Sequence, residues 1–211
     1  MDKFTEEGSS WNLLSVDEIK LECYGLEALA GGSTFKELPE SLANKKACIN
    51  VKNDDDKCLV WATLSALFAP TKNAGRIAHY KPRENYFKRD GITFSADVKD
   101  VQKFAGMNNL VINVFGWEND SLTIYHIDKN LYQSGAPTPI NLLLYKSHYD
   151  WIKYINALTY SLNKHRDVKH LCLKCLSTFN DELNLELHIQ ECIKYHDGEC
   201  NIEMPKQGTF T

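Results

Sequence analysis

The sequence contains no long hydrophobic run, and none approaches the roughly 20 apolar residues that a membrane-spanning helix requires. Its first residues, MDKFTEEGSSW, are acidic and polar, whereas a signal peptide has a basic start followed by an apolar stretch. Internal repeats and low-complexity tracts are also lacking. We therefore expect an intracellular protein, cytoplasmic or nuclear, with no membrane contact.

A net positive charge is missing as well. The 211 residues carry a formal charge of -4 at pH 7, which gives no overall case for a nucleic-acid binder. The seven cysteines are an odd number. Without a secretory signal, this count favours free or metal-bound thiols in a reducing compartment over a disulfide framework.

The composition is that of a folded protein, because 43% of the residues are hydrophobic and 25% are charged. The length suits one domain of ordinary size with a small appendage. We divide the chain into four parts: an N-terminal extension with a possible strand (1–45), a main domain (46–165), a small Cys/His unit (168–200) and a tail (201–211).

The apolar pattern predicts an α+β fold in which a helix precedes an antiparallel sheet. Helical spacing runs from Lys57 to Phe68, and a second helix is predicted over 95–107 with Ser95 as its N-cap. The segment 148–155 is interpreted either as a strand or as the entry to a helix. Strand-like runs occupy 19–24, 47–51, 110–116, 121–127 and 140–145.

The most specific spacing in the chain is Cys-x2-Cys-x12-His-x3-Cys, which falls on Cys172, Cys175, His188 and Cys192. Zinc takes four such ligands in a tetrahedron. A hairpin supplies the first two, and one turn of a helix presents the other two on the same face. The spacing therefore predicts a structural Zn²⁺ site in a small ββα finger.

The charge of this finger argues against the reading of duplex DNA. From residue 176 to residue 211 there are seven acidic residues against Lys194 and Lys206, and a phosphate backbone would be repelled. We expect a structural or protein-binding role instead.

Cys58 follows three aspartates at the predicted start of a helix, and two interpretations of it are open. The free N–H groups of a helix N-terminus stabilise a thiolate, as a nucleophile requires. Three nearby carboxylates act in the opposite direction, which favours a capped helix with a buried core thiol. In that case Asp55 or Asp56 is the N-cap.

A partner for a nucleophilic thiol is available far along the chain. His148 follows an apolar strand, and Asp150 lies two residues further on, so an extended backbone places both side chains on one face. A histidine with a carboxylate beside it is the arrangement of a general base with an orienting partner.

The segments DDKCL (55–59) and HYD (148–150) resemble the two signature blocks of OTU-type cysteine peptidases, which remove ubiquitin. The resemblance implies a papain-like fold, with the catalytic helix packed on the sheet. It also implies Cys58 as nucleophile, His148 as base and Asp150 as orienting acid. The partner would be ubiquitin or a ubiquitin-like protein.

Further roles follow from the same comparison. Asn53 lies where ubiquitin-specific proteases have their oxyanion asparagine, and Asp55 is either a loop residue or an alternative acid for the histidine. Trp61, Tyr149 and Trp151 are candidates for lining a channel for a Gly-Gly tail. Core packing is the alternative interpretation of each tryptophan.

A second resemblance covers the chain from about residue 10 to its end. The stretches LANKKACINVKNDDDKCLVWATLSALF, VQKFAGMNNLVINVFG, INLLLYKSHYDWI and MPKQGTF are similar to the region upstream of the exonuclease domain in B-family DNA polymerases of Polinton (Maverick) elements. The resemblance implies a peptidase module carried by a virus-like transposon protein. No polymerase activity is expected from this portion.

The competing function is a non-catalytic nucleic-acid or replication-complex module. Segment 71–90 carries six basic residues interleaved with Tyr80, Tyr86 and Phe87, a mixture that grips single strands by charge and stacking. A surface loop beside the active cleft, or a contact for ubiquitin, is the other interpretation of the segment. A degenerate peptidase fold used only for binding is a third option.

Overall fold

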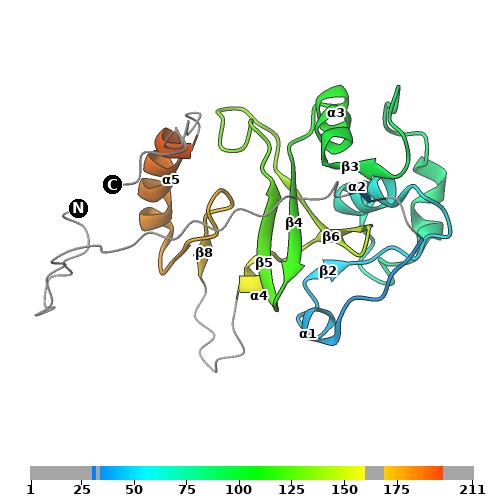
Figure 1. Ribbon diagram of the computed structural model, residues 1–211, viewed down its shortest axis with the longest axis horizontal. Helices are drawn as coiled ribbons and strands as arrows, with labels where there is room; N and C mark the ends of the chain where they lie inside the picture. Colours follow the sequence, from blue (N-terminus) through cyan, green and yellow to red (C-terminus); the bar gives the residue numbers. More distant parts are fainter. Residues whose placement is uncertain (1–29, 32–33, 160–168, 197–211) are drawn as a thin grey trace, which may run out of the picture.

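The computed structural model describes residues 30–31, 34–159 and 169–196 (Figure 1). The strand predicted over 19–24 and the tail over 201–211 lie outside the described residues. The fold is a mixed α+β arrangement around a five-stranded sheet, and a Cys/His cluster follows it in the chain. No helix within the described ranges is both long and apolar enough to cross a membrane.

The five strands lie in the order β2-β7-β6-β4-β5. The prediction of a fully antiparallel sheet is wrong, because β4 and β6 run parallel, with Ile112 opposite Ile140. The hairpin partner β5 covers the outer side of β4, and the chain then returns to place β6 between β4 and β7. The strands are β2 (Cys48–Ile49), β4 (Ile112–Glu118), β5 (Ser121–His126), β6 (Ile140–Tyr145) and β7 (His148–Ile152).

Both faces of this sheet are covered, so its central strands are almost wholly buried. Leu142 and Leu144 of β6 belong to the core beneath α2 (Cys58–Phe68) and α3 (Val98–Asn108). Leu143, between them in sequence, belongs to a second core on the opposite face. Figure 1 shows α2 and α3 on one side of the strands and the finger on the other.

The helices predicted over 57–68 and 95–107 are present, but their N-caps differ from the prediction. The N-cap of α2 is Lys57, with no side-chain cap, and the Asp55 carboxylate accepts instead from the Lys57 N–H and from the Trp61 indole in the helix. The N-cap of α3 is Asp97 rather than Ser95: its carboxylate accepts from the N–H of Asp100, and the Asp100 carboxylate accepts in return from the N–H of Asp97.

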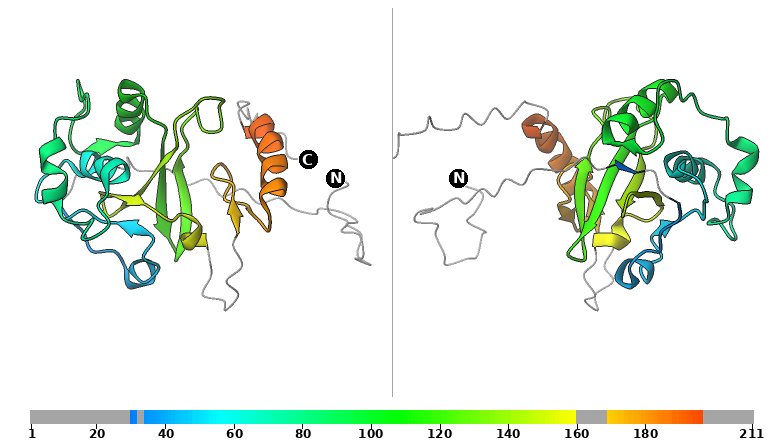
Figure 2. Two further views of the ribbon diagram at one scale, coloured as in Figure 1. Left: turned by 180° about the vertical axis from the view of Figure 1, so that it is seen from behind. Right: turned by 45° about the vertical axis from the view of Figure 1, so that its right-hand side comes forward.

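The finger has the predicted ββα order, with β8 (His170–Leu171), β9 (Thr178–Phe179) and α5 (Glu182–His196). It is packed on the sheet: Leu171 and Leu173 join the core of the face away from α2. The Leu173 N–H also donates to the Tyr132 hydroxyl oxygen at 2.8 Å. The two views of Figure 2 agree that the strands lie between the finger and α2.

Short elements complete the fold. β1 (Ala30–Gly31) pairs with β3 (Ala96–Asp97) ahead of α3. In the segment 148–155, only His148–Ile152 form a strand, and the short helix α4 begins after the segment. The remaining elements are α1 (Glu40–Ala43), α4 (Asn156–Thr159) and the 3-10 turns η1 (Ile77–His79) and η2 (Lys81–Arg83).

Candidate active site and metal centre

Cys58 is the first residue of α2, and its side chain is buried with 1% exposure. The helix is apolar around its whole first half, so these turns are enclosed by the core rather than lying on its surface. The first N–H groups of a helix have no acceptor within the helix and carry a partial positive charge. In this position the helix dipole acts in favour of a negative charge, whereas burial in the apolar core acts against it.

His148 is the first residue of β7, and α2 packs against this strand. The His148 Nε2 lies 3.6 Å from Asp150 Oδ1, and both side chains are only 1% exposed. That separation suits an ion pair and is too long for a hydrogen bond. The structure thus brings together the two residues that the sequence places two apart on one strand face.

The carboxyl group of Asp150 is buried and has few polar partners. Neither of its oxygens accepts a hydrogen bond from the described residues. Burial raises the pKa of Asp150 well above its ordinary value. The Cys48 thiol on neighbouring β2 is affected in turn: burial and then the Asp150 charge raise the pKa of Cys48. No sequence pattern indicates Cys48, because its closeness to Asp150 depends on the pairing of β2 with β7.

The alternation along β7 decides which side chains face α2. Tyr149 and Trp151 belong to the core that contains Cys58, so His148 and Asp150 are directed to the other face of the strand. His148 itself lies at the beginning of β7. Phe35 marks this place: its ring lies edge-on to His148 with centroids 6.4 Å apart, and its N–H donates to the Asn53 carbonyl at 3.0 Å.

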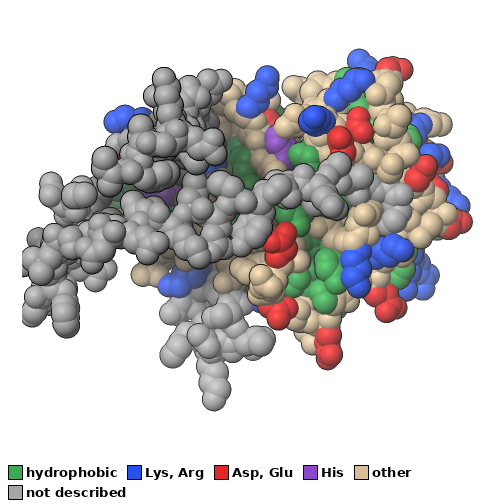
Figure 3. All heavy atoms as spheres, in the orientation of Figure 1, with side chains coloured by type: hydrophobic (Ala, Val, Ile, Leu, Met, Phe, Trp, Pro, Cys, Tyr) green, Lys and Arg blue, Asp and Glu red, His purple; other side chains and the backbone are tan. Residues whose placement is uncertain are grey.

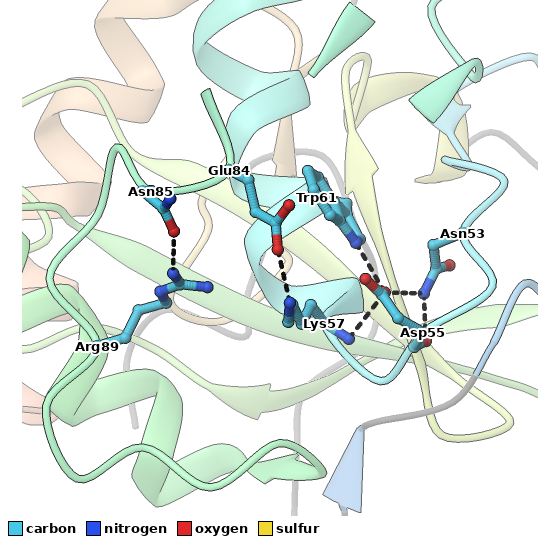
Figure 4. A network of polar contacts seen from close by, with 7 residues as sticks. All are labelled: Asn53, Asp55, Lys57, Trp61, Glu84, Asn85 and Arg89. Atoms are coloured by element: carbon cyan, nitrogen blue, oxygen red, sulfur yellow. Dashed lines mark hydrogen bonds and ion pairs between the residues drawn. The ribbon is translucent and has the colours of Figure 1, made fainter. Parts of the chain in front are cut away.

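The loop before Cys58 is organised around Asp55 (Figure 4). Asp55 Oδ1 accepts from Trp61 Nε1 at 2.8 Å, from the Lys57 N–H at 3.1 Å and from Asn53 Nδ2 at 3.1 Å. Although burial acts to raise the pKa of Asp55, hydrogen bonds from Trp61, Asn53 and Lys57 lower it below the ordinary value. Asp55 is thus the residue that ties the loop to the first turn of α2.

These contacts bear on the predicted roles of Asn53 and Asp55. The Asn53 Nδ2 also donates to the Asp55 carbonyl at 2.6 Å, so this amide is directed into its own loop. The carboxylate next to His148 is that of Asp150, whereas the Asp55 carboxylate is turned to Trp61. On the outer side of the same loop, Lys57 pairs with Glu84 at 2.6 Å.

The three aromatic residues suggested as substrate contacts pack against the core. Trp61 is 1% exposed and donates to Asp55, and Tyr149 is 1% exposed and donates its hydroxyl to the Ala96 carbonyl at 3.2 Å. Burial, followed by the charge of Cys58, raises the pKa of Tyr149. Trp151 is half-buried against the same core. Of the three, Trp151 has the most surface left for a ligand.

Segment 71–90 exposes fewer aromatic side chains for stacking on nucleic-acid bases than its composition indicates. Tyr80 and Phe87 are buried, at 0% and 6% exposure, and only Tyr86 projects at 60%. The Arg83 guanidinium stacks on Phe68, 4.7 Å from the ring centroid. Two of the three aromatics predicted to stack on bases are therefore part of the core.

The four predicted metal ligands meet in one cluster. One ligand atom from each of Cys172, Cys175, His188 and Cys192 lies within 4.8 Å of all the others. The Cys172 and Cys192 sulfurs are 3.9 Å apart, and the Cys175 sulfur is 3.2 Å from His188 Nε2. Tetrahedral zinc, with bonds of about 2.3 Å to sulfur and about 2.0 Å to nitrogen, separates its ligand atoms by roughly 3.5–3.8 Å. The cluster is therefore close enough to hold a metal ion.

No family model, curated protein or solved structure matches this chain.

Proposed function

We propose that the protein is a cysteine peptidase with Cys58 as nucleophile, His148 as base and Asp150 as orienting acid. One observation carries the proposal: a buried His148–Asp150 pair, 3.6 Å apart, begins the strand against which the Cys58 helix packs. A fully buried carboxylate is costly unless a positive group compensates it. An imidazolium formed at His148 during reaction supplies that compensation.

The reaction proceeds in two steps. The Cys58 sulfur attacks the carbonyl carbon of the scissile amide while His148 holds the proton of the thiol; the tetrahedral intermediate collapses, the C–N bond breaks and His148 protonates the leaving amine. Water then attacks the thioester with His148 as base, which releases the carboxylate and restores the thiol. Catalytic contacts in a free enzyme are often longer than in its complex, and the 3.6 Å pair accords with this.

The oxyanion is assigned to the first-turn N–H groups of α2. These groups point at the position where charge develops beside the Cys58 sulfur, and the helix dipole adds to their effect. Asn53 donates to Asp55 instead, which supports a role in holding the loop. The proposed donors are therefore backbone groups, with the Asn53 side chain behind them.

The proposed substrates are the C-terminal Gly-Gly tails of ubiquitin or a ubiquitin-like protein. The supporting features are the DDKCL and HYD segments, whose resemblance to OTU-type peptidases also favours a papain-like fold for the main domain. The similarity to Polinton polymerase proteins gives a setting for such a module, a virus-like element that reverses host modification. Burial of Cys58 favours a thin, extended tail as substrate.

The decisive assay is release of a fluorophore from the C-terminal amide of ubiquitin by the full chain. We expect thiol-dependent turnover that disappears in Cys58→Ala. Cys48→Ala is the matched control, since Cys48 lies beside Asp150 without belonging to the mechanism, and it should keep at least a third of the rate. Turnover that survives in Cys58→Ala, or none at all from the folded wild type, would overturn the proposal.

We further propose that the Cys/His cluster binds zinc with a structural role. Four protein ligands close the coordination shell and leave no position for a substrate. The packing of Leu171 and Leu173 on the sheet supports a finger that seals this end of the domain. Metal analysis of the purified chain tests the identity: one zinc per chain, lost in Cys175→Ser, is expected.

A further inference from the structure

A cavity of about 610 Å³ lies between α3 and residues 126–130, which are the last residue of β5 and the loop after it, at the far edge of the sheet from β2. Lys99, Gln102, Lys103 and Gly106 form one wall, and their spacing places them on a single face of α3. Pockets for small molecules usually measure about 300–1,000 Å³. The cavity shares no residue with the proposed active site or with the metal cluster.

The walls of this cavity are cationic although the chain as a whole carries a charge of -4. Lys99 and Lys103 come from α3, and Lys129 faces them from the loop after β5. Lys103 uses one of its three N–H groups on the Gly91 carbonyl at 2.8 Å, and two remain. Figure 3 shows Lys and Arg side chains in the region of α3, with a histidine among them.

Asp128 is the acidic residue of the cavity wall, and its carboxylate accepts two backbone hydrogen bonds. Its Oδ1 accepts from the Asn130 N–H at 2.8 Å and its Oδ2 from the Ile112 N–H at 3.4 Å. The side chain is buried, with 6% exposure. The carboxylate therefore braces the loop, and the three lysines of the lining outnumber it.

His126 gives the cavity a fixed polar surface. Gln102 Nε2 lies 3.1 Å from His126 Nδ1, so the amide donates to that nitrogen when Nε2 carries the proton. Burial lowers the pKa of His126, and the charge of Asp128 acts in the opposite direction. Because the net shift is downward, the ring is neutral at pH 7. A neutral imidazole offers a hydrogen bond and a flat face rather than another charge.

Gly106 has no packing reason to be glycine. A Cβ built at this position meets nothing within 4 Å, and the residue lies inside a helix, where glycine costs about 1 kcal/mol relative to alanine. Its missing side chain leaves open space in the wall of the cavity. Space and positive charge thus occur together at one place.

We infer that this cavity binds a small molecule that carries a di- or triphosphate group, with Lys99, Lys103 and Lys129 contacting the phosphates. Ammonium groups are compact point charges suited to phosphate oxygens, and three of them match a group with two to four negative charges. The volume left beside the lysines accommodates a nucleoside-sized body against His126. The inference is independent of the proposed peptidase activity.

Calorimetric titration of the full chain with inorganic triphosphate and, separately, with ATP tests the inference. We expect both to bind in 0.1 M salt, with Kd raised about tenfold in the double variant Lys99→Gln/Lys129→Gln. Tighter binding of ATP would identify a nucleotide as the source of the phosphates. Equal binding would identify the phosphate chain alone.

Two further variants separate a built site from general charge attraction. Lys153→Gln removes an exposed lysine elsewhere, and its Kd should stay within twofold of the wild type. Gly106→Leu should keep or raise the unfolding temperature, because leucine is the better helix former, while weakening binding about tenfold. The inference would be overturned if the wild type did not bind triphosphate. It would also be overturned if Lys153→Gln lost as much affinity as Lys99→Gln/Lys129→Gln, or if Gly106→Leu bound triphosphate as tightly as the wild type.

Discussion

The metal cluster and the proposed active site are assembled in opposite ways. The four ligands of the cluster come from one short stretch, where a hairpin and a helix bring them together locally. Cys58 and His148 come from the starts of α2 and β7, two elements that are far apart in the sequence and pack against each other. The spacing of residues in the sequence specifies the first site, whereas the second site forms only when the sheet has folded and α2 has packed on it.

Their surroundings differ as well. Cys175 and His188 are partly exposed, so a metal can reach them, while His148 and Asp150 are enclosed. In the cluster, a bound metal ion would hold the hairpin and the helix of the finger together through four ligands. In the proposed active site, burial raises the pKa of Asp150, so ionisation of this group lowers stability; perturbed pKa values of this kind are common at catalytic groups.

Loss of the metal should give the largest effect. Structural zinc contributes on the order of 10 kcal/mol to the folding of a small finger. We therefore expect Cys175→Ser, or a strong chelator, to unfold α5, with a loss of helical circular dichroism in the full chain. Cys48→Ser should bind the metal normally. Retention of α5 after complete metal removal would show that packing on the sheet suffices.

Replacement of the base comes next. His148→Gln should lower the rate of ubiquitin amide hydrolysis about 10²–10⁴-fold, the usual contribution of a general base. The exposed His79 provides the control, and His79→Gln should leave the rate unchanged. A modest effect at His148, comparable to that of His79, would place the base elsewhere.

Asp150→Asn should separate stability from activity. Because burial raises the pKa of Asp150, the folded state binds the proton more tightly than the unfolded state, and this group's contribution falls as pH rises above 3.8. The variant lacks this loss. The difference in unfolding free energy between the variant and the wild type should therefore change in favour of the variant from pH 4 to pH 8, while the rate of hydrolysis falls. Urea unfolding across this range, with Asp54→Asn as exposed control, measures it. An unfolding free energy that increases with pH more in the wild type than in the variant would contradict this expectation.

The smallest expected effect concerns the loop before Cys58. The pKa of Asp55 is lowered in the folded state, so its contribution is present above the ordinary value of 3.8 and is lost as pH falls through the lower folded value. Asp55→Asn should cost about 1–2 kcal/mol at pH 7, from weakened hydrogen bonds, and less near pH 3. Exposed Asp56→Asn is its neighbour and control. If both variants lost the same unfolding free energy, Asp55 would not stabilise the loop more than its exposed neighbour does.

Local features were predictable from the sequence where neighbouring residues determine them. The Cys-x2-Cys and His-x3-Cys spacings gave the cluster, and the apolar pattern after Lys57 gave α2 as Cys58–Phe68. The order of the strands was not predictable in this way. Whether β6 runs parallel to β4 depends on the path of residues 127–139, which carries no periodic signal.

The same limit applies to the active site. The i, i+2 spacing placed His148 and Asp150 on one face of a strand, as the structure has them. It could not identify Phe35 or Cys48 as their neighbours, because both arrive through tertiary packing. Nor could the aspartates before Cys58 be assigned, since the Trp61 indole competes with the helix N-terminus for Asp55.

The central claim is that Cys58 is an aligned nucleophile. Its most direct test is to expose the full chain to ubiquitin with a thiol-reactive group at its C-terminus and to record the intact mass. The account predicts an adduct of one ubiquitin on Cys58, located by peptide mapping and absent in Cys58→Ala. An unlabelled folded chain, or an adduct on another cysteine, would contradict it.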